Sequence, residues 1–252
     1  MEPCVKPCET RAYGCEKARG SSDYKAEVEV EEILGWFKRP FARVLDLGCG
    51  TDRHAVSLAG KGYHVVGLDR SSDALTRAAE RSAGMTGLSF KKSDLEEDDL
   101  TSHGIQDLVL SLGNTMSHLS RTRLIEIFLS IRRILAPGGV FCFNTLYWSN
   151  PTPKSSVEND PSGEVSVIWE RKLNEEKGTM LLKGHFVKDG VTQVTEAQCY
   201  KAPEVVNLLK LAGFGSVRWS NRLDFKGRNL AGVDTMYYRV MLPSAGHPKQ
   251  FC

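Results

Sequence analysis

The chain has 252 residues, of which 41% are hydrophobic and 25% are charged, the composition of an ordinary soluble globular protein. Its 33 Lys and Arg against 31 Asp and Glu give a formal charge of +2, too small for a strong field toward nucleic acid or membranes. No apolar run approaches the ~20 residues of a membrane-spanning helix. Residues 1–20 lack the apolar segment of a secretory signal. We therefore expect a cytoplasmic protein with one large α/β domain and a small insertion.

The seven cysteines are odd in number and scattered, which does not fit a disulfide framework. Cys4, Cys8 and Cys15 cluster near the start, but no fourth ligand is nearby and their spacing fits no zinc pattern. Cys49 and Cys142 lie in apolar segments and are expected to be reduced. We expect no metal site, and we interpret the first residues as an N-terminal arm.

The first part of the chain alternates helical and strand patterns. Residues 24–38 show apolar side chains at helical spacing and end at Pro40. Short apolar segments then predict five strands, at 43–47, 64–68, 88–90, 107–111 and 140–143. Helical segments separate them, one ending at Gly60 or Gly62, one from Ser71 or Ser72 to 82, and one at 121–135. This βαβ alternation predicts a doubly wound, mostly parallel Rossmann-like sheet.

The alternation breaks after Trp148. Residues 149–163 are rich in Ser, Pro and Asn, which predicts a loop. Antiparallel strands are expected at 165–171, 180–188 and 191–200, then a helix at 203–211 and closing strands at 217–220 and 235–241. We divide the chain into an arm and lid helix (1–39), a cofactor-binding core (40–148), an antiparallel cap insertion (149–200), the rest of the core (201–242) and a tail (243–252).

The sharpest motif is residues 44–51, VLDLGCGT, where a strand ends in Asp46 and two spaced glycines precede a helix. Glycines without a Cβ let the backbone approach a ligand closely. Asp69 closes the second strand and can accept two ribose hydroxyls, as acids at this place do in dinucleotide folds. Asp94 closes the third strand and could accept from an adenine amino group. A dinucleotide loop would read G-x-G-x-x-G, but here the last position is Arg53, so pyrophosphate is not expected.

Together, DLGCG at 46–50, GLD at 67–69, SDL at 93–95 and LAPGG at 135–139 resemble the class I S-adenosylmethionine-dependent methyltransferases. The resemblance covers about 24–148 closely and the C-terminal part more loosely. It implies that S-adenosylmethionine is the cofactor and that it is held at Asp46, Gly48, Cys49, Gly50, Asp69, Arg70, Asp94, Leu95, Leu112 and Gly113. In the family, the first motif contacts the methionine end, the acid matching Asp69 the ribose, and the acid matching Asp94 the adenine.

One position departs from the family pattern Gly-x-Gly-Thr-Gly, because Asp52 replaces the last glycine. Its carboxylate could repel the carboxylate of the methionine group. We favour the alternative that Asp52 caps the following helix. The departure leaves the fold untouched and puts only the affinity for the cofactor in question.

A narrower resemblance concerns the acceptor. Residues 13–29 are similar to the N-terminal lid of small-molecule methyltransferases that act on nucleotide-linked amino sugars, and 112–119 look like the matching segment of glycine N-methyltransferases. His118 matches a histidine of the amino-sugar enzymes and is our candidate catalytic residue; a structural hydrogen bond is its alternative. His54 and His64 are expected to be packing or surface residues. Candidates to bind the acceptor are Tyr13, Tyr24, Asn114, Tyr147 and Trp148. The four aromatic residues among them could wall the site, where their faces suit the sulfonium cation of the cofactor.

These observations predict a methyltransferase acting on a small molecule, at an amine nitrogen, in a monomer or homodimer. The alternatives are an O-methyltransferase of a metabolite, a tRNA or RNA methyltransferase, and a cofactor-binding protein without turnover. The near-neutral charge argues against nucleic acid, and Asp52 keeps the non-catalytic alternative open.

Overall fold

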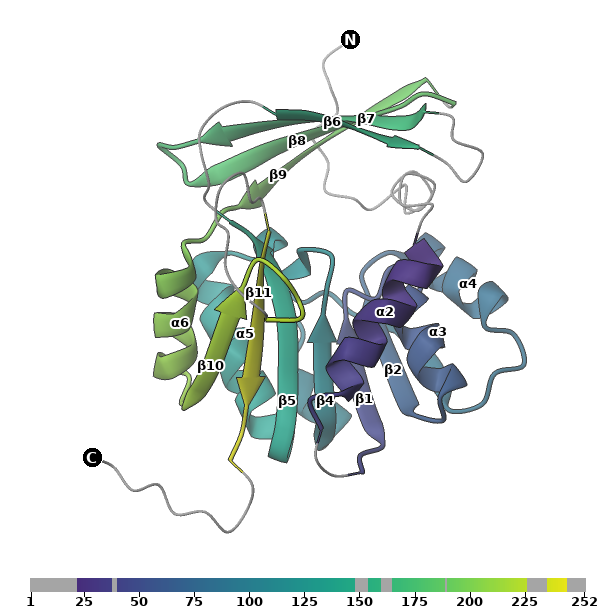
Figure 1. Ribbon diagram of the computed structural model, residues 1–252, viewed down its shortest axis with the longest axis vertical. Coiled ribbons are helices and arrows are strands. Elements are labelled where there is room, and N and C mark those ends of the chain that lie inside the picture. Colours follow the sequence, from purple (N-terminus) through teal and green to yellow (C-terminus); the bar gives the residue numbers. More distant parts are fainter. Residues whose placement is uncertain are drawn as a thin grey trace.

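The computed structural model describes residues 22–37, 40–147, 154–159, 165–188, 190–225 and 235–243. A seven-stranded sheet forms the centre, in the order β10-β11-β5-β4-β1-β2-β3 (Figure 1). Its strands are β1 (Arg43–Leu47), β2 (His64–Asp69), β3 (Leu88–Lys92), β4 (Gln106–Ser111), β5 (Leu135–Leu146), β10 (Ser216–Ser220) and β11 (Thr235–Met241). The strands from β1 to β5 pair in parallel, whereas β11 is antiparallel to both β5 and β10. The doubly wound, mostly parallel sheet predicted from the sequence is confirmed.

Helices cover both faces of this sheet (Figure 1). They are α2 (Ser22–Leu34), α3 (Arg53–Gly60), α4 (Ser72–Arg81), α5 (Arg121–Ile134) and α6 (Ala202–Leu211), with short 3-10 helices η1 (Leu100–His103) and η2 (Thr115–His118). Side chains of α5 and α6 pack on one face of the central strands, and those of α2 and α3 on the other. None of the helices in this described part of the chain is long and apolar enough to cross a membrane.

Neighbouring residues of the central strands enter opposite cores, because side chains alternate along a strand. In β1, Leu45 belongs to the α5 and α6 side, and Val44 to the α2 and α3 side. The first core is built on stacked rings, with Phe143 at 4.5 Å from Phe141 and 4.7 Å from Tyr238 between ring centroids. All six residues of β4 are buried, as expected for a central parallel strand.

A second sheet is inserted after β5. It is antiparallel, in the order β6-β7-β8-β9, and lies beyond the carboxyl ends of the parallel strands (Figure 1). Its strands are β6 (Lys154–Asn159), β7 (Val165–Asn174), β8 (Thr179–Phe186) and β9 (Val191–Gln198). Met180 and Ala197 pack with Leu146 of β5, which attaches this sheet to the end of the central one.

The structure corrects two predicted segments. Residues 154–159, expected to be loop, form β6 as the edge strand of the inserted sheet. β5 begins at Leu135, well before the predicted Val140, because residues 136–139 bulge and continue the pairing. Within that bulge Gly138 has a φ of 73°, and its N–H donates to Leu242 O over 3.1 Å. The predicted tail after Pro243 lies outside the described residues.

Candidate active site

The glycine turn between β1 and α3 is held against the end of β2. The N–H groups of Gly48 and Cys49 both donate to Leu68 O, over 2.7 and 2.9 Å. Gly48 has a φ of 71°, and a Cβ there would lie 2.4 Å from Cγ2 of Thr115. Gly50 has a φ of 57°, but a Cβ there would meet no atom within 4 Å. Gly48 is therefore required by packing, whereas Gly50 borders open space.

Asp69, at the end of β2, is tied to this turn. Its Oδ2 accepts from Gly50 N over 2.9 Å, and its Oδ1 accepts from Ser71 N over 2.8 Å. Ser71 in turn caps α4, since its side chain accepts from Ala74 N. A carboxylate has about four lone-pair sites, so two sites of Asp69 remain for a ligand. The sequence-predicted ribose acceptor is thus fixed in orientation by two backbone donors.

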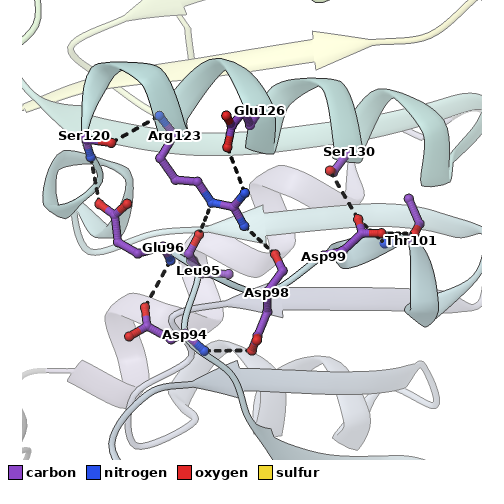
Figure 2. A network of polar contacts seen from close by, with 10 residues as sticks. All are labelled: Asp94, Leu95, Glu96, Asp98, Asp99, Thr101, Ser120, Arg123, Glu126 and Ser130. Carbon is purple, nitrogen blue, oxygen red and sulfur yellow. Dashed lines mark hydrogen bonds and ion pairs between the residues drawn. The ribbon is translucent and has the colours of Figure 1, made fainter.

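The end of β3 brings a second predicted acid to the same edge. Asp94 Oδ1 accepts from Glu96 N over 3.0 Å, while Asp94 N donates to Asp98 Oδ2 over 2.9 Å (Figure 2). Its Oδ2 lies 4.0 Å from Nη2 of Arg70, the residue after β2. The end of β2, with Asp69 and Arg70, is therefore brought together with Asp94, which lies further along the sequence.

Arg123 of α5 fixes the segment that follows β3 (Figure 2). Its Nε donates to Leu95 O over 2.6 Å, and its Nη2 donates to Asp98 O. One turn earlier, the N–H of Ser120 donates to Glu96 Oε1 over 2.8 Å. Leu95 itself is buried. The sequence analysis did not identify this arginine, because nothing local links residue 123 to residues 95–98.

The loop after β4 carries Leu112, Gly113 and Asn114. Gly113 and Asn114 both have a positive φ, of 86° and 66°. The N–H of Asn114 donates to Oδ1 of Asn144 on β5 over 2.7 Å, and Asn114 Oδ1 is buried without a hydrogen-bond partner. A buried acceptor without a donor costs free energy, of about 1–3 kcal/mol.

Negative charge gathers around the glycine turn. Asp46 is buried at the end of β1, and burial raises the pKa of its carboxyl to about 6, although His54 and Arg53 act to lower it. Its Oδ2 has no hydrogen-bond partner. Burial, and then the carboxylates of Asp46, Asp69 and Asp52, hold the pKa of the Cys49 thiol well above its usual range, so that thiol is neutral. Such a surrounding favours a cationic ligand.

The expected capping role of Asp52 is wrong. Asp52 stands at the N-cap of α3, but its side chain makes no capping hydrogen bond. The physical reason is its φ of 80°, because a capping side chain requires extended backbone at that position. The side chain is fully buried, and its Oδ1 lies 3.6 Å from Nε of Arg81 on α4. The carboxylate is thus directed to α4.

The acceptor-side candidates are only partly placed. His118 ends η2 and its side chain is exposed, whereas Asn114 stands at the N-cap of the same short helix. Tyr147 follows β5 and pairs with Tyr200 in an isolated bridge. Tyr24 lies in the first turn of α2, and Tyr13 and Trp148 lie outside the described residues, as do the cysteines near the start. Within the part of the chain that is described, no three His, Cys, Asp or Glu are grouped to hold a metal ion.

Sequence reasoning missed a buried pair between α2 and α3. His54 Nε2 lies 2.8 Å from Glu29 Oε2, with side-chain exposures of 7% and 11%. Neither residue matches a motif. The signal that could have found them is an acid and a histidine on the buried faces of two helices.

Comparison with known proteins shows what kind of domain carries these residues. Residues 44–139 match a family described as a methyltransferase domain. An uncharacterized methyltransferase of Synechocystis, sll0829, is 29% identical over 174 residues, which cover 64% of this chain and 78% of the relative. The chain contains a class I methyltransferase domain.

Two solved structures show the same fold. The S-adenosylmethionine-bound CalS10 of Micromonospora echinaspora, an amino pentose methyltransferase, has a TM-score of 0.67 at 18% identity, covering 93% of this chain and 98% of that one. The sugar N-methyltransferase KedS8 of Streptoalloteichus has a TM-score of 0.64 at 16% identity, covering 97% of each chain. Methyltransferases of this class use S-adenosylmethionine, and this chain is such an S-adenosylmethionine-dependent enzyme.

The residues of the site fit that cofactor. The open side of Gly50 leaves room for it, and the unpartnered Oδ2 of Asp46 provides an acceptor for an ammonium group. Asp69 keeps lone pairs for ribose hydroxyls. The surrounding carboxylates suit the positive charge of a sulfonium.

Proposed function

We propose that this methyltransferase transfers a methyl group from S-adenosylmethionine to the nitrogen of a small-molecule amine. The observation that carries the proposal is Asn114. Its backbone is held in a left-handed conformation by Asn144, and its buried Oδ1 lacks a donor. Non-glycine residues with positive φ are costly and cluster at functional sites. An amine N–H of the acceptor would supply the missing donor.

The cofactor supplies a methyl group on a good leaving group, so the protein contributes mainly proximity and alignment. Asp46, Gly50 and Asp69 would hold the cofactor, with Arg70, Asp94 and Leu95 near its base and with Leu112 and Gly113 beside it. Asn114 Oδ1 would accept one N–H of the amine and orient its lone pair. These assignments extend the contacts described above.

An ammonium acceptor must lose a proton before its lone pair can attack. His118 is our candidate base, since a histidine is partly neutral near pH 7. It lies at the exposed end of η2, four residues after Asn114. The buried Ser117 beside it fixes η2 to β5, because its Oγ accepts from Leu146 N over 2.8 Å. Tyr147, Tyr24, Tyr13 and Trp148 remain proposed contacts of the acceptor.

The compared structures support a small amine as the acceptor. CalS10 is an amino pentose methyltransferase and KedS8 a sugar N-methyltransferase, and both cover nearly the whole of this chain, inserted sheet included. An amino sugar is therefore the first class of acceptor to test. Phenols and tRNA represent the alternatives of O-methylation and RNA methylation.

The test is production of S-adenosylhomocysteine with panels of amino sugars, simple amines, phenols and tRNA, followed by mass spectrometry of the product. We expect turnover with an amine. Asn114→Gly, which tolerates the positive φ, should lower kcat/KM for the acceptor at least tenfold and leave S-adenosylhomocysteine affinity within twofold. Asn174→Gly, at the end of β7, is the matched control. Methylation of phenols or tRNA alone would overturn the proposal.

A further inference from the structure

Two arginines face each other on the neighbouring strands β10 and β11. Arg218 pairs directly with Arg239 in the antiparallel register, so both side chains project from the same side of the sheet. That side is the one on which α2 packs, because Tyr237 and Met241, two residues before and after Arg239, join the same core as α2 and α3. Like charges directly opposite each other on two strands are destabilising. The sheet alone therefore gives no reason for this pair.

No carboxylate neutralises the two guanidinium groups within the described segments. There, neither side chain forms an ion pair or a hydrogen bond with another residue, and Nε of Arg239 is buried without an acceptor. Glu32 of α2 is engaged elsewhere, since its Oε1 accepts from Trp36 Nε1 over 3.3 Å. Two positive charges and a buried donor without a partner indicate a place where an anion binds.

Two aromatic rings hold these guanidinium groups. Cζ of Arg239 lies 4.9 Å from the ring centroid of Trp36 and 5.3 Å from that of Phe225. Cζ of Arg218 lies 5.8 Å from the centroid of the same Phe225 ring. An arginine that contacts a ring through its flat face keeps N–H donors at its edge, in the fork that matches an oxyanion. Phe225 has a φ of 53°, a costly conformation for a bulky residue and one that is typical of functional sites.

These four residues are accessible from solvent. Arg218 is exposed, whereas Arg239, Trp36 and Phe225 are half-buried. Among the described helices, α2 lies across β4 and β1, and none lies across β10 and β11 on this side of the sheet (Figure 1). A small anion can therefore reach the guanidinium groups.

The arginine pair lies apart from the glycine turn. Arg239 pairs with Cys142 of β5, and the same row of the sheet continues through Leu110 of β4 to Asp46 of β1. Asp46 is thus three strands away, which corresponds to about 14 Å at the usual spacing between strands. An anion held by the arginines would not occupy the contacts assigned to the cofactor.

We propose that Arg218 and Arg239 form a second binding site, specific for a phosphate group, with Trp36 and Phe225 as its aromatic walls. Phosphate fits this pair better than a carboxylate does. A phosphate monoester carries a charge of about −1.5 to −2 at pH 7 and three acceptor oxygens, which matches two guanidinium forks. The inference goes beyond methyl transfer and does not depend on the identity of the methyl acceptor.

The experiment titrates the natural protein with inorganic phosphate in a calorimeter at constant ionic strength, with acetate as the comparison anion. We expect saturable binding of phosphate and at least about tenfold weaker binding of acetate. A second titration uses glycerol phosphate. Tighter binding of this ester than of inorganic phosphate would assign the site to phosphorylated small molecules, and weaker binding would assign it to free phosphate.

Variants with a matched loss of charge test the two arginines. Arg218→Gln and Arg239→Gln should each weaken phosphate binding at least about tenfold, because each removes charge-assisted hydrogen bonds. Arg222→Gln removes the same charge from an exposed arginine nearby, which is already paired with Asp224 over 2.6 Å. Its phosphate affinity should stay within about twofold of the natural value. Because Arg218 is exposed, its variant tests the site even if Arg239→Gln does not fold.

The remaining titration is repeated with the protein saturated by S-adenosylhomocysteine. Phosphate affinity should not change, since Asp46 lies three strands from Arg239. Competition between the two ligands would place phosphate at the glycine turn and overturn this inference. The absence of saturable phosphate binding, equal affinity for acetate, or an equal loss in Arg222→Gln would also overturn it, and each would leave the proposed methyl transfer standing.

Discussion

The backbone N–H of Gly50 donates to Oδ2 of Asp69 over 2.9 Å, joining the turn after β1 to the end of β2. This bond presents the open side of Gly50 and the free lone pairs of Asp69 on one edge of the sheet. Any ligand held by one of these residues therefore meets the other. Each also depends on the other for its position, so a variant of either residue should weaken binding.

Replacing Asp69 should weaken cofactor binding. Asp69→Ala removes the acceptor of two backbone N–H groups and, in the proposed site, of the ribose hydroxyls, a loss of about 1.5–3 kcal/mol, or about 10- to 150-fold in Kd. Calorimetry with S-adenosylhomocysteine measures this. Asp73→Ala, an exposed acid in the first turn of α4, is the control. Unchanged affinity in Asp69→Ala would remove this residue from the site.

The two glycines of the turn should separate stability from binding. Gly48→Ala places a Cβ 2.4 Å from Thr115 at a positive φ, so we expect a loss of about 2–4 kcal/mol in the free energy of unfolding. Gly50→Ala meets no atom and should cost only about 1–2 kcal/mol. Its Cβ should nevertheless weaken S-adenosylhomocysteine binding at least tenfold. Denaturant unfolding and calorimetry give both values, and tight binding by Gly50→Ala would show that the open side is not used.

Replacing Asp52 by glycine should relieve strain in the backbone at this position. At a φ of 80°, glycine is relaxed and alanine is not. We expect Asp52→Gly to be more stable than Asp52→Ala by about 1 kcal/mol, as measured by urea unfolding. A tenfold rise in S-adenosylhomocysteine affinity in both variants would show that the carboxylate opposes the cofactor despite its contact with Arg81. Equal stability of the two variants would contradict the strain.

His118 should affect turnover without affecting the cofactor. If it is a base, His118→Ala lowers kcat by about 10²–10⁴-fold, with S-adenosylhomocysteine affinity unchanged. His118→Asn distinguishes the roles, because an amide can orient the acceptor but cannot take its proton. His185→Ala is the control, since His185 is exposed on β8 and bonded to Thr192. Near-normal turnover in both His118 variants would leave catalysis to proximity alone.

The parts of the fold that could be predicted from the sequence are those with local signals. The strand at 235–241 has its predicted bounds. Of the two alternatives for the start of α4, Ser71 and Ser72, the structure has Ser71 as the cap. Both features could be predicted because periodicity and capping chemistry are encoded within a few residues. β6 could not be predicted in this way. Its sequence KSSVEN is polar, and Val157 in its middle is 57% exposed, so only pairing with β7 makes it a strand.

The same distinction applies to the site. Asp69 and Asp94 could be located because each ends an apolar strand, and parallel strands end at one edge. The contacts of Asn114 with Asn144 and of Glu29 with His54 span 30 and 25 residues, and no local pattern encodes such pairs. The left-handed backbone conformation of Asp52 could not be predicted either, because an acid before a helix usually indicates a cap.

The inserted sheet leaves and rejoins the core at neighbouring points. Tyr200 N donates to Leu146 O over 3.1 Å, and Tyr147 bridges to Tyr200. The inserted segment of about fifty residues therefore begins and ends at the same place on the central sheet. Insertions or deletions within this segment should therefore leave β1 to β4 in place, together with the glycine turn and its acids.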